Sequence, residues 1–265
     1  RAVAGGIGLD PAVPAVVPLG RLHVAGVVGE GRDAAGLATW LTAQIAAQHS
    51  PRDVALAVLA PDHVQEWEWS KWLPHVHRFG DEIRTIAADD GEASSLFAAL
   101  RDLAERRADD DQQGIGGGSR RWSPHGVVVI QPPLRLSPRE MASFLELAPT
   151  VGFSIIWIDA DRMSLPGECR AIVELGRGGR SARITFTDGG MQLDPVHADS
   201  LTSGQAEVLA RALAPLRDVS GDGGTAELPA RVDLLELYEP KPTDAEAMIA
   251  RWHLDDGSSL GATIG

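Results

Sequence analysis

The chain is poor in cysteine and in positive charge. Its 265 residues include one cysteine, Cys169, which excludes an internal disulfide framework and is typical of a protein from a reducing compartment. We expect Cys169 to be a small buried apolar residue. The formal net charge of −13 argues against a nucleic-acid-binding surface, because such a surface needs a concentrated positive field.

Long apolar runs are also missing from the sequence. No stretch approaches the roughly 20 apolar residues that a membrane span needs, and no signal peptide is visible. The chain starts at Arg1 without a methionine and stops at Gly265, so we expect it to be a piece of a longer protein. Hydrophobic residues make up 44% of the chain, which is enough to bury a core of one large or two small domains.

A glycine-rich turn follows the apolar run at residues 22–28, and a helical pattern follows the turn. This is the layout of a phosphate-binding loop, in which backbone N–H groups and a helix N-terminus surround an anion. A tight turn without any ligand is the alternative interpretation of the same glycines. The predicted nucleotide-binding positions of this degenerate loop are Gly26, Gly29, Glu30, Gly31, Arg32 and Asp33.

Two residues alter the chemistry of this loop. In the motif G-x-x-x-x-G-K-[ST], the lysine contacts the outer phosphates and the hydroxyl binds magnesium. Arg32 and Asp33 occupy these positions here. Arginine still pairs well with phosphate, but a carboxylate at the start of the helix repels it. We predict that Asp33 is the N-cap of the helix, so that its side chain replaces the anion.

A second motif is altered at the end of the apolar run 126–130, which is typical of a central parallel strand. In P-loop NTPases this strand ends in an aspartate that holds the magnesium shell, often followed by a glutamate that polarises the attacking water. Gln131 and Pro132 stand at these positions, and neither side chain can act as a base. With both motifs changed, we predict no magnesium-dependent hydrolysis and no metal site.

Alternating strand-like and helical patterns predict an α/β fold with a mostly parallel sheet. Strands are expected at 22–28, 53–59, 84–87, 126–130 and 153–158, with edge strands at 172–175 and 183–187. Helices are expected at 34–48, 92–107, 137–147 and 202–213. In the last helix we expect Val208, Leu209, Ala212 and Leu213 to face inward. Residues 109–121 have almost nothing to bury and are predicted to form a mobile loop.

Three of the seven tryptophans, Trp67, Trp69 and Trp72, lie in one short stretch. One hypothesis is a lid packed over the core; the other is a surface for a partner, because tryptophan is enriched at binding hot spots. His75 and His77 follow without nearby cysteine or aspartate, so we predict no metal site there.

Two further features lie beside the predicted strands. Asp159 ends the strand at 153–158, where parallel sheets place their sites, and we interpret it as a loop cap rather than a catalytic residue. Arg177 and Arg180 lie in a glycine-rich turn at 176–179. They are predicted to be solvated, with a neighbouring subunit or a nucleotide as the alternative partner.

Several segments together carry a resemblance to a known family. They are the turn 26–33, Gln-His-Ser-Pro-Arg-Asp at 48–53, the tryptophan stretch 67–75, Leu-Ala-Pro-Leu-Arg at 213–217, and the tail 228–265 with Leu-Leu-Glu-Leu at 234–237. From about Leu19 onward the chain resembles the membrane ATPases of type VII (ESX) secretion systems, the EccC/EssC proteins of the FtsK/SpoIIIE class. The resemblance implies a P-loop NTPase-like three-layer α/β sandwich.

The resemblance also implies a domain organisation and a function. Residues 1–19 would be an extended entry segment, 20–227 a degenerate P-loop ATPase-like domain, and 228–265 a linker toward the next ATPase module. The domain would be membrane-proximal, on the cytoplasmic face, and would reach the membrane only through a transmembrane part outside this sequence. Its partners would be the downstream ATPase modules, other core subunits of the secretion machine and copies of itself, and not nucleic acid.

We therefore predict a non-catalytic structural and coupling domain, without a bound cofactor. The first alternative is a domain that binds ATP weakly and hydrolyses it slowly, with Arg32 in place of the motif lysine. The second alternative is a switch that binds nucleotide without turnover, since ligand binding stabilises the conformation that binds it. Both alternatives leave ATP binding open, while magnesium is not expected.

Overall fold

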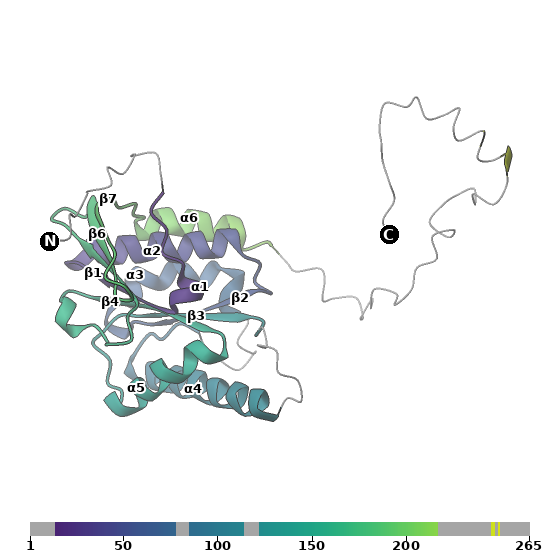
Figure 1. Ribbon diagram of the computed structural model, residues 1–265, viewed down its shortest axis with the longest axis horizontal. Coiled ribbons are helices and arrows are strands. Elements are labelled where there is room, and N and C mark those ends of the chain that lie inside the picture. Colours follow the sequence, from purple (N-terminus) through teal and green to yellow (C-terminus); the bar gives the residue numbers. More distant parts are fainter. Residues whose placement is uncertain (1–13, 78–84, 114–121, 217–244, 247–248, 250–265) are drawn as a thin grey trace. The chain divides into compact units, whose positions relative to one another are not determined.

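The computed structural model describes residues 14–77, 85–113, 122–216, 245–246 and 249 (Figure 1). The chain divides into two compact units, Arg1–Asp218 and Val219–Gly265, and the fold described here is that of the first unit. Residues 1–13 of the entry segment, the predicted boundary at residues 227 and 228, and most of the tail 228–265 lie outside the described residues. The predicted domain limits therefore stay predictions.

A seven-stranded sheet organises the first unit, in the order β2-β3-β4-β1-β5-β6-β7. The first five strands in the chain are parallel and the last two are antiparallel to their neighbours. The strands are β1 (Val24–Val28), β2 (Val54–Leu59), β3 (His125–Ile130), β4 (Phe153–Asp159), β5 (Ala171–Leu175), β6 (Ser181–Phe186) and β7 (Gln192–His197). In the middle of the sheet Val27 of β1 lies between Ile158 and Val173.

Helices cover both faces of the sheet, which gives three layers (Figure 1). One face packs against α2 (Gly31–Gln48), α6 (Ser203–Leu213) and residues 64–77, here called the tryptophan segment. This segment consists of α3 (Val64–Trp67), η2 (Glu68–Trp72) and η3 (Pro74–His77). The other face packs against α4 (Asp90–Gln113) and α5 (Pro138–Leu147). The short helices α1 (Leu19–Leu22), η1 (Pro61–His63), η4 (Ala148–Val151) and η5 (Arg162–Ser164) lie in the connections.

Burial on both faces explains the apolar runs that dominate the parallel strands. Every residue of β1 and β2 is buried, as is every residue of β3 after His125. A parallel strand covered by helices on both sides reads as a continuous hydrophobic run rather than an alternation. The predicted fold class, a mostly parallel α/β sandwich, is confirmed.

Two predicted helix starts have the expected side-chain caps. The Ser137 hydroxyl accepts a hydrogen bond from the backbone N of Glu140 at the start of α5. Thr202 and Gln205 form a complete capping box at the start of α6, in which each side chain bonds the other residue's backbone. These caps satisfy N–H groups that have no partner within the helix.

The region after β4 differs from the prediction. β5 was expected at an edge of the sheet, but it lies between β1 and β6, and β6 lies between β5 and β7. The edge strand is β7, which the sequence did not reveal because Asp194 and Pro195 interrupt its apolar pattern. The strand expected at 84–87 is a single parallel bridge between Val58 and Ile86 among the described residues.

Two helices also differ in detail. α4 continues to Gln113, so the first five residues of the loop predicted at 109–121 are helical, and residues 114–121 lie outside the described residues. In α6 the buried side chains are Ala206 and Ala210, while Val208 is 72% exposed. The predicted inward face of α6 is confirmed for Leu209 and Leu213, which pack against the core, and is wrong for Val208 and Ala212, which are exposed.

Candidate functional site

The glycine turn is shorter than a phosphate-binding loop. β1 continues to Val28 and α2 begins at Gly31, so two residues, Gly29 and Glu30, separate the strand from the helix. The backbone N of Gly29 donates to the Asp159 carbonyl at 3.1 Å and thereby extends the pairing of β1 with β4. Gly26, predicted as the first residue of the loop, is a strand residue in the middle of β1.

Close packing explains two of the three glycines. A Cβ added to Gly26 would lie 2.5 Å from Leu165 Cδ1 and 3.3 Å from Cys169 Sγ, in the connection between β4 and β5. A Cβ added to Gly29 would lie 3.1 Å from Leu175 Cδ1. Gly31 has open space around it but a φ of +49°, a left-handed conformation that favours glycine. Side-chain packing therefore explains Gly26 and Gly29, and the turn conformation explains Gly31.

Asp33 does not cap the helix. The N-cap of α2 is Glu30, in extended backbone and without a side-chain capping bond, and Asp33 is the third residue of the helix. The predicted N-cap role of Asp33 is therefore wrong. Its side chain lies beside the turn between β5 and β6, where a Cβ added to Gly179 would meet Asp33 Cγ at 2.8 Å. A carboxylate in the first turn still interacts favourably with the helix dipole.

The charged side chains around the turn are solvated. Glu30 and Arg32 are exposed, as are Arg177 and Arg180 in the turn that lies against Asp33. Among the described residues, none of these three arginines has a carboxylate within ion-pair distance. Arg32 is thus an exposed side chain, and it is the neighbouring Asp33 that lies against the β5–β6 turn.

Gln131 has a partner away from the glycine turn. The residue is 7% exposed at the end of β3, and its backbone N donates to the Leu59 carbonyl at 2.9 Å. Its side-chain Oε1 accepts a hydrogen bond from Trp67 Nε1 at 2.8 Å. The position that carries an acid in P-loop NTPases therefore holds a neutral amide that joins the sheet to the tryptophan segment. Pro132 follows it, half-buried.

The tryptophan segment belongs to the core. Trp67 is 0% and Trp69 is 2% exposed, with ring centroids 6.3 Å apart, so the prediction that they form a partner surface is wrong. Trp72 is partly buried, and the Arg211 guanidinium of α6 lies 3.9 Å from its ring centroid. These large apolar rings are most stable out of water, so the lid hypothesis is confirmed for Trp67 and Trp69.

The predicted histidine and aspartate roles have local explanations. His75 is buried, with Nε2 2.9 Å from the His49 carbonyl, and the His77 side chain is outside the described residues. The part of the chain that the structure describes contains no cluster of three or more His, Cys, Asp or Glu suited to a metal ion. Asp159 Oδ1 accepts a hydrogen bond from the backbone N of Asp161 at 3.2 Å, which confirms its loop-cap role.

Cys169 is an inert core residue, as predicted. It is buried beside Gly26. Burial, and then the negative charge of Glu168, raise the pKa of the Cys169 thiol to about 12. Since the thiolate is the reactive form of cysteine, this residue stays protonated and unreactive near neutral pH.

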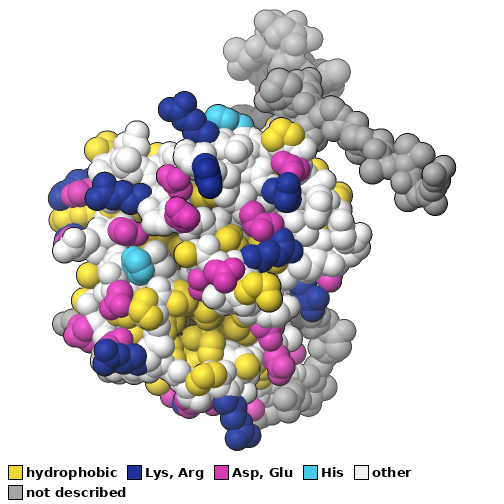
Figure 2. Space-filling view, turned by 90° about the vertical axis from the view of Figure 1, so that its left-hand side faces the viewer, with side chains coloured by type: hydrophobic (Ala, Val, Ile, Leu, Met, Phe, Trp, Pro, Cys, Tyr) yellow, Lys and Arg dark blue, Asp and Glu magenta, His cyan; other side chains and the backbone are white. Residues whose placement is uncertain are grey.

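An apolar pocket of about 400 Å³ lies beside α5, at the carboxyl ends of β3 and β4. Figure 2 shows hydrophobic side chains gathered in a hollow in the lower half of the face that it presents. The sequence analysis did not predict this pocket. The sequence feature that could have indicated it is the alternation of apolar residues in the loop after β3. Its lining comprises Pro132, Leu134, Leu136, Pro138, Met141, Ala142, Leu145, Trp157, Ser164, Pro166 and Glu168.

Comparisons with known proteins agree on one family. No protein-family model matches the chain. The ESX secretion system protein EccC of Geobacillus thermodenitrificans is 24% identical over 243 residues, which cover 91% of this chain and 16% of the relative. The type VII secretion system protein EssC of Staphylococcus aureus is 23% identical over 222 residues, 80% of this chain and 14% of EssC. The homologues of this chain are the EccC/EssC ATPases of type VII secretion.

A shorter match is closer in sequence. The ESX-5 protein EccC5 of Mycobacterium marinum is 37% identical over 113 residues, 39% of this chain and 8% of EccC5. The chain therefore spans about one sixth, or less, of the EccC and EssC relatives that it matches.

Solved EccC structures share the fold. The cytoplasmic domain of the Thermomonospora curvata type VII secretion ATPase EccC matches with a TM-score of 0.51 and 15% identity, over 71% of this chain and 25% of that chain. ATPases 2 and 3 of the same EccC, in complex with a signal sequence peptide, match with a TM-score of 0.51 and 13% identity, over 72% and 39%. The predicted P-loop ATPase-like fold is confirmed. None of the helices that the structure describes has the length and apolarity to cross a membrane.

Proposed function

We propose that this chain is a structural and coupling domain of a type VII secretion ATPase and does not hydrolyse ATP. The homology to EccC and EssC supports its place in the secretion machine. The observation that carries the non-catalytic role is the buried hydrogen bond of Gln131, because a neutral side chain that is already bonded stands where P-loop NTPases have the aspartate of the magnesium shell.

The short glycine turn supports the same proposal. A phosphate cradle needs several consecutive backbone N–H groups that converge on one anion. Here the Gly29 N–H is bonded to the Asp159 carbonyl, and the Asp33 N–H is bonded to the Glu30 carbonyl at 3.2 Å. The turn therefore offers fewer free N–H groups than a phosphate cradle uses, and the Asp33 carboxylate beside them adds negative charge.

The homology to secretion ATPases supports the proposed partners. In this proposal the domain lies at the cytoplasmic face of the cell membrane and connects a membrane anchor to the downstream ATPase modules of the same chain. It contacts other core subunits of the secretion machine and copies of itself in an oligomer. The EccC and EssC relatives are six or more times longer than the matched region, which leaves room for such modules.

Calorimetric titration with ATP and ADP, with and without magnesium, tests the proposal. We expect no heat of binding for the wild-type chain and none for Asp33→Ser, because the turn is too short to form a cradle even without the carboxylate. Arg139→Ala, at an exposed arginine on the opposite side of the sheet, is the matched control for Arg32→Ala.

Two outcomes of this titration favour the alternatives. Magnesium-dependent ATP turnover that is lost in Arg32→Ala and kept in Arg139→Ala would overturn the proposal and support slow hydrolysis. Micromolar binding of ATP without turnover would support a nucleotide-sensing switch instead.

A further inference from the structure

We infer that Gln131 is a positioning residue that holds the tryptophan segment on the sheet and, through that segment, holds α6. The inference rests on the proposed coupling function. It names the contacts within the first unit through which a change at the end of β3 would reach α6. α6 is the last described helix of this unit, and the chain passes from it into the second unit. The contact that carries the inference is the hydrogen bond between Gln131 Oε1 and Trp67 Nε1.

This hydrogen bond joins two buried groups from distant parts of the chain. Trp67 is fully buried and Gln131 is 7% exposed, and 64 residues separate them in the sequence. An indole has a single N–H donor. Removal of its acceptor leaves a buried donor without a partner, which is far more costly than the loss of an exposed hydrogen bond.

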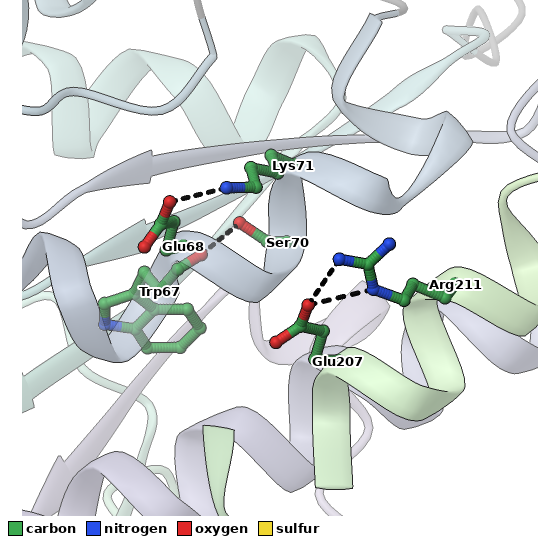
Figure 3. A network of polar contacts seen from close by, with 6 residues as sticks. All are labelled: Trp67, Glu68, Ser70, Lys71, Glu207 and Arg211. Carbon is green, nitrogen blue, oxygen red and sulfur yellow. Dashed lines mark hydrogen bonds and ion pairs between the residues drawn. The ribbon is translucent and has the colours of Figure 1, made fainter. Parts of the chain in front are cut away.

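The tryptophan segment depends on such contacts because its own helices are short. α3 and η3 have four residues each and η2 has five, and helices of this length are not stable alone. Within the segment, the Ser70 hydroxyl donates to the Trp67 carbonyl at 2.7 Å (Figure 3). At its end, the Thr85 hydroxyl donates to the Val76 carbonyl. The indole of Trp67 joins the segment directly to Gln131, the residue that follows β3.

The same segment supports α6. η2 packs against α6, and the Arg211 guanidinium lies over the Trp72 ring at 3.9 Å. Arg211 also pairs with Glu207 at 2.8 Å, and Figure 3 shows both side chains on the side of α6 that meets the tryptophan segment. The fully buried side chains of α6 are two alanines, and Leu209 and Leu213 are partly buried against the same core. Its position therefore depends on η2 and α2.

Together these contacts form a continuous chain from the carboxyl end of β3 to the exit of the unit. A group that binds near the end of β3 and displaces the Gln131 amide would free Trp67 and loosen η2 and α6. Coupling between the end of β3 and α6 is measured at α6 itself.

Hydrogen exchange of the 265-residue chain, measured by mass spectrometry without nucleotide, provides that test. In Gln131→Met we expect amides in 64–77 and 203–213 to exchange about tenfold faster, because the unpaired indole N–H destabilises the closed segment. Amides of α5, on the other face, should keep their wild-type rates. Gln131→Asn withdraws the acceptor by one methylene while it keeps a polar amide, and it should give the same pattern if Gln131→Met does not fold.

Two comparisons distinguish the loss of the hydrogen bond between Gln131 and Trp67 from a general loss of stability. Met141→Ala, a buried substitution in α5, should accelerate exchange in α5 without a selective effect on α6. Trp67→Phe combined with Gln131→Met removes both polar partners. Its exchange in α6 should be no faster than in Trp67→Phe alone, because the two changes remove the same bond.

The inference is overturned if Gln131→Met and Gln131→Asn accelerate exchange in 64–77 but not in 203–213. It is also overturned if α5 and α6 accelerate equally, since that pattern indicates global destabilisation. Because no nucleotide is present, the result is independent of the calorimetric test. ATP turnover would overturn the non-catalytic function and leave this contact intact.

Discussion

The glycine turn and the tryptophan segment are the two most distinctive stretches of the sequence. The turn is exposed in the structure, whereas the tryptophan segment packs into the core. The turn resembles a ligand site but is short, exposed and charged, with glycines explained mainly by packing. The tryptophan segment resembles an exposed docking surface, yet Trp67 and Trp69 are buried. The difference shows that residue type marks a stretch as unusual, whereas the burial or exposure of its side chains depends on neighbours far away in the sequence.

The largest effect on stability should come from the tryptophan segment, which is the buried one of the two stretches. We expect Trp67→Ala to lower the free energy of unfolding by about 3–5 kcal/mol, from lost apolar contact and a large cavity. Chemical denaturation with urea measures this change. Val208→Ala, at a 72% exposed position on α6, is the control and should change stability by less than about 0.5 kcal/mol. Equal effects of the two substitutions would contradict the burial of Trp67.

The next prediction concerns the packing role of the glycines. Gly26→Ala should destabilise the fold by about 1–3 kcal/mol, because its Cβ would overlap Leu165 Cδ1. Thermal unfolding measures this change. The double variant with Leu165→Ala should recover part of the loss. If Gly26→Ala leaves stability unchanged and instead creates or removes an effect of ATP, Gly26 belongs to a ligand loop after all.

A third prediction contrasts the two ends of β3. His125, at the amino end, has Nε2 2.9 Å from Ser154 Oγ, and burial, followed by the positive charges of His23, Arg107 and His49, lowers its pKa to about 4. In the unfolded chain histidine binds a proton below about pH 6.5. The folded chain resists that proton until about pH 4, so stability should fall as the pH falls from 6.5 to 4.

The expected loss across this window is about 2 kcal/mol, allowing for partial screening by solvent. Urea denaturation at pH 7, 6, 5 and 4 measures it, and His125→Gln should flatten the dependence. A wild-type chain whose stability rises toward pH 4 would show that another group dominates. Gln131, at the opposite end of β3, carries no titratable group and adds nothing to this dependence.

The smallest predicted effect lies at the outer rim of the tryptophan segment. Arg211→Ala should cost about 0.5–1 kcal/mol through the lost contact with Trp72. Arg177→Ala, at an exposed arginine beside the glycine turn, should be neutral. Measured together in urea, the two variants separate a packed arginine from a solvated one. A larger effect for Arg177 would reverse their assignment.

Sequence reasoning located most of the parallel sheet because its signals are local. The apolar runs of β2 and β3 and the caps at Ser137 and Thr202 each depend on neighbouring residues, and each was found. The position of Gln131 at the end of a central strand was found in the same way. Whether the chain binds nucleotide stays a prediction.

The errors arose where a distant contact decides the outcome. Gly26 was assigned to a loop because the leucine that requires it, Leu165, is 139 residues away in the sequence. Asp33 was assigned to a cap because the helix was expected to begin at residue 34, whereas α2 begins at Gly31 and the Asp33 side chain lies against Gly179 of the β5–β6 turn. No local sequence pattern predicts the hydrogen bond from Trp67 to Gln131, because the sequence does not distinguish a tryptophan in a core from one on a surface.

The interrupted edge strand β7 has a consequence for assembly. Pro195 has no N–H to offer a neighbouring strand, and Asp194 pairs with Arg183 across the sheet at 2.7 Å. Proline and charge on an edge strand oppose the addition of further strands. At the other edge, the bridge between Ile86 and Val58 already occupies part of β2. Copies of this domain that meet in a larger complex would therefore join through side chains of helices and loops, and not through a sheet that continues from one molecule to the next.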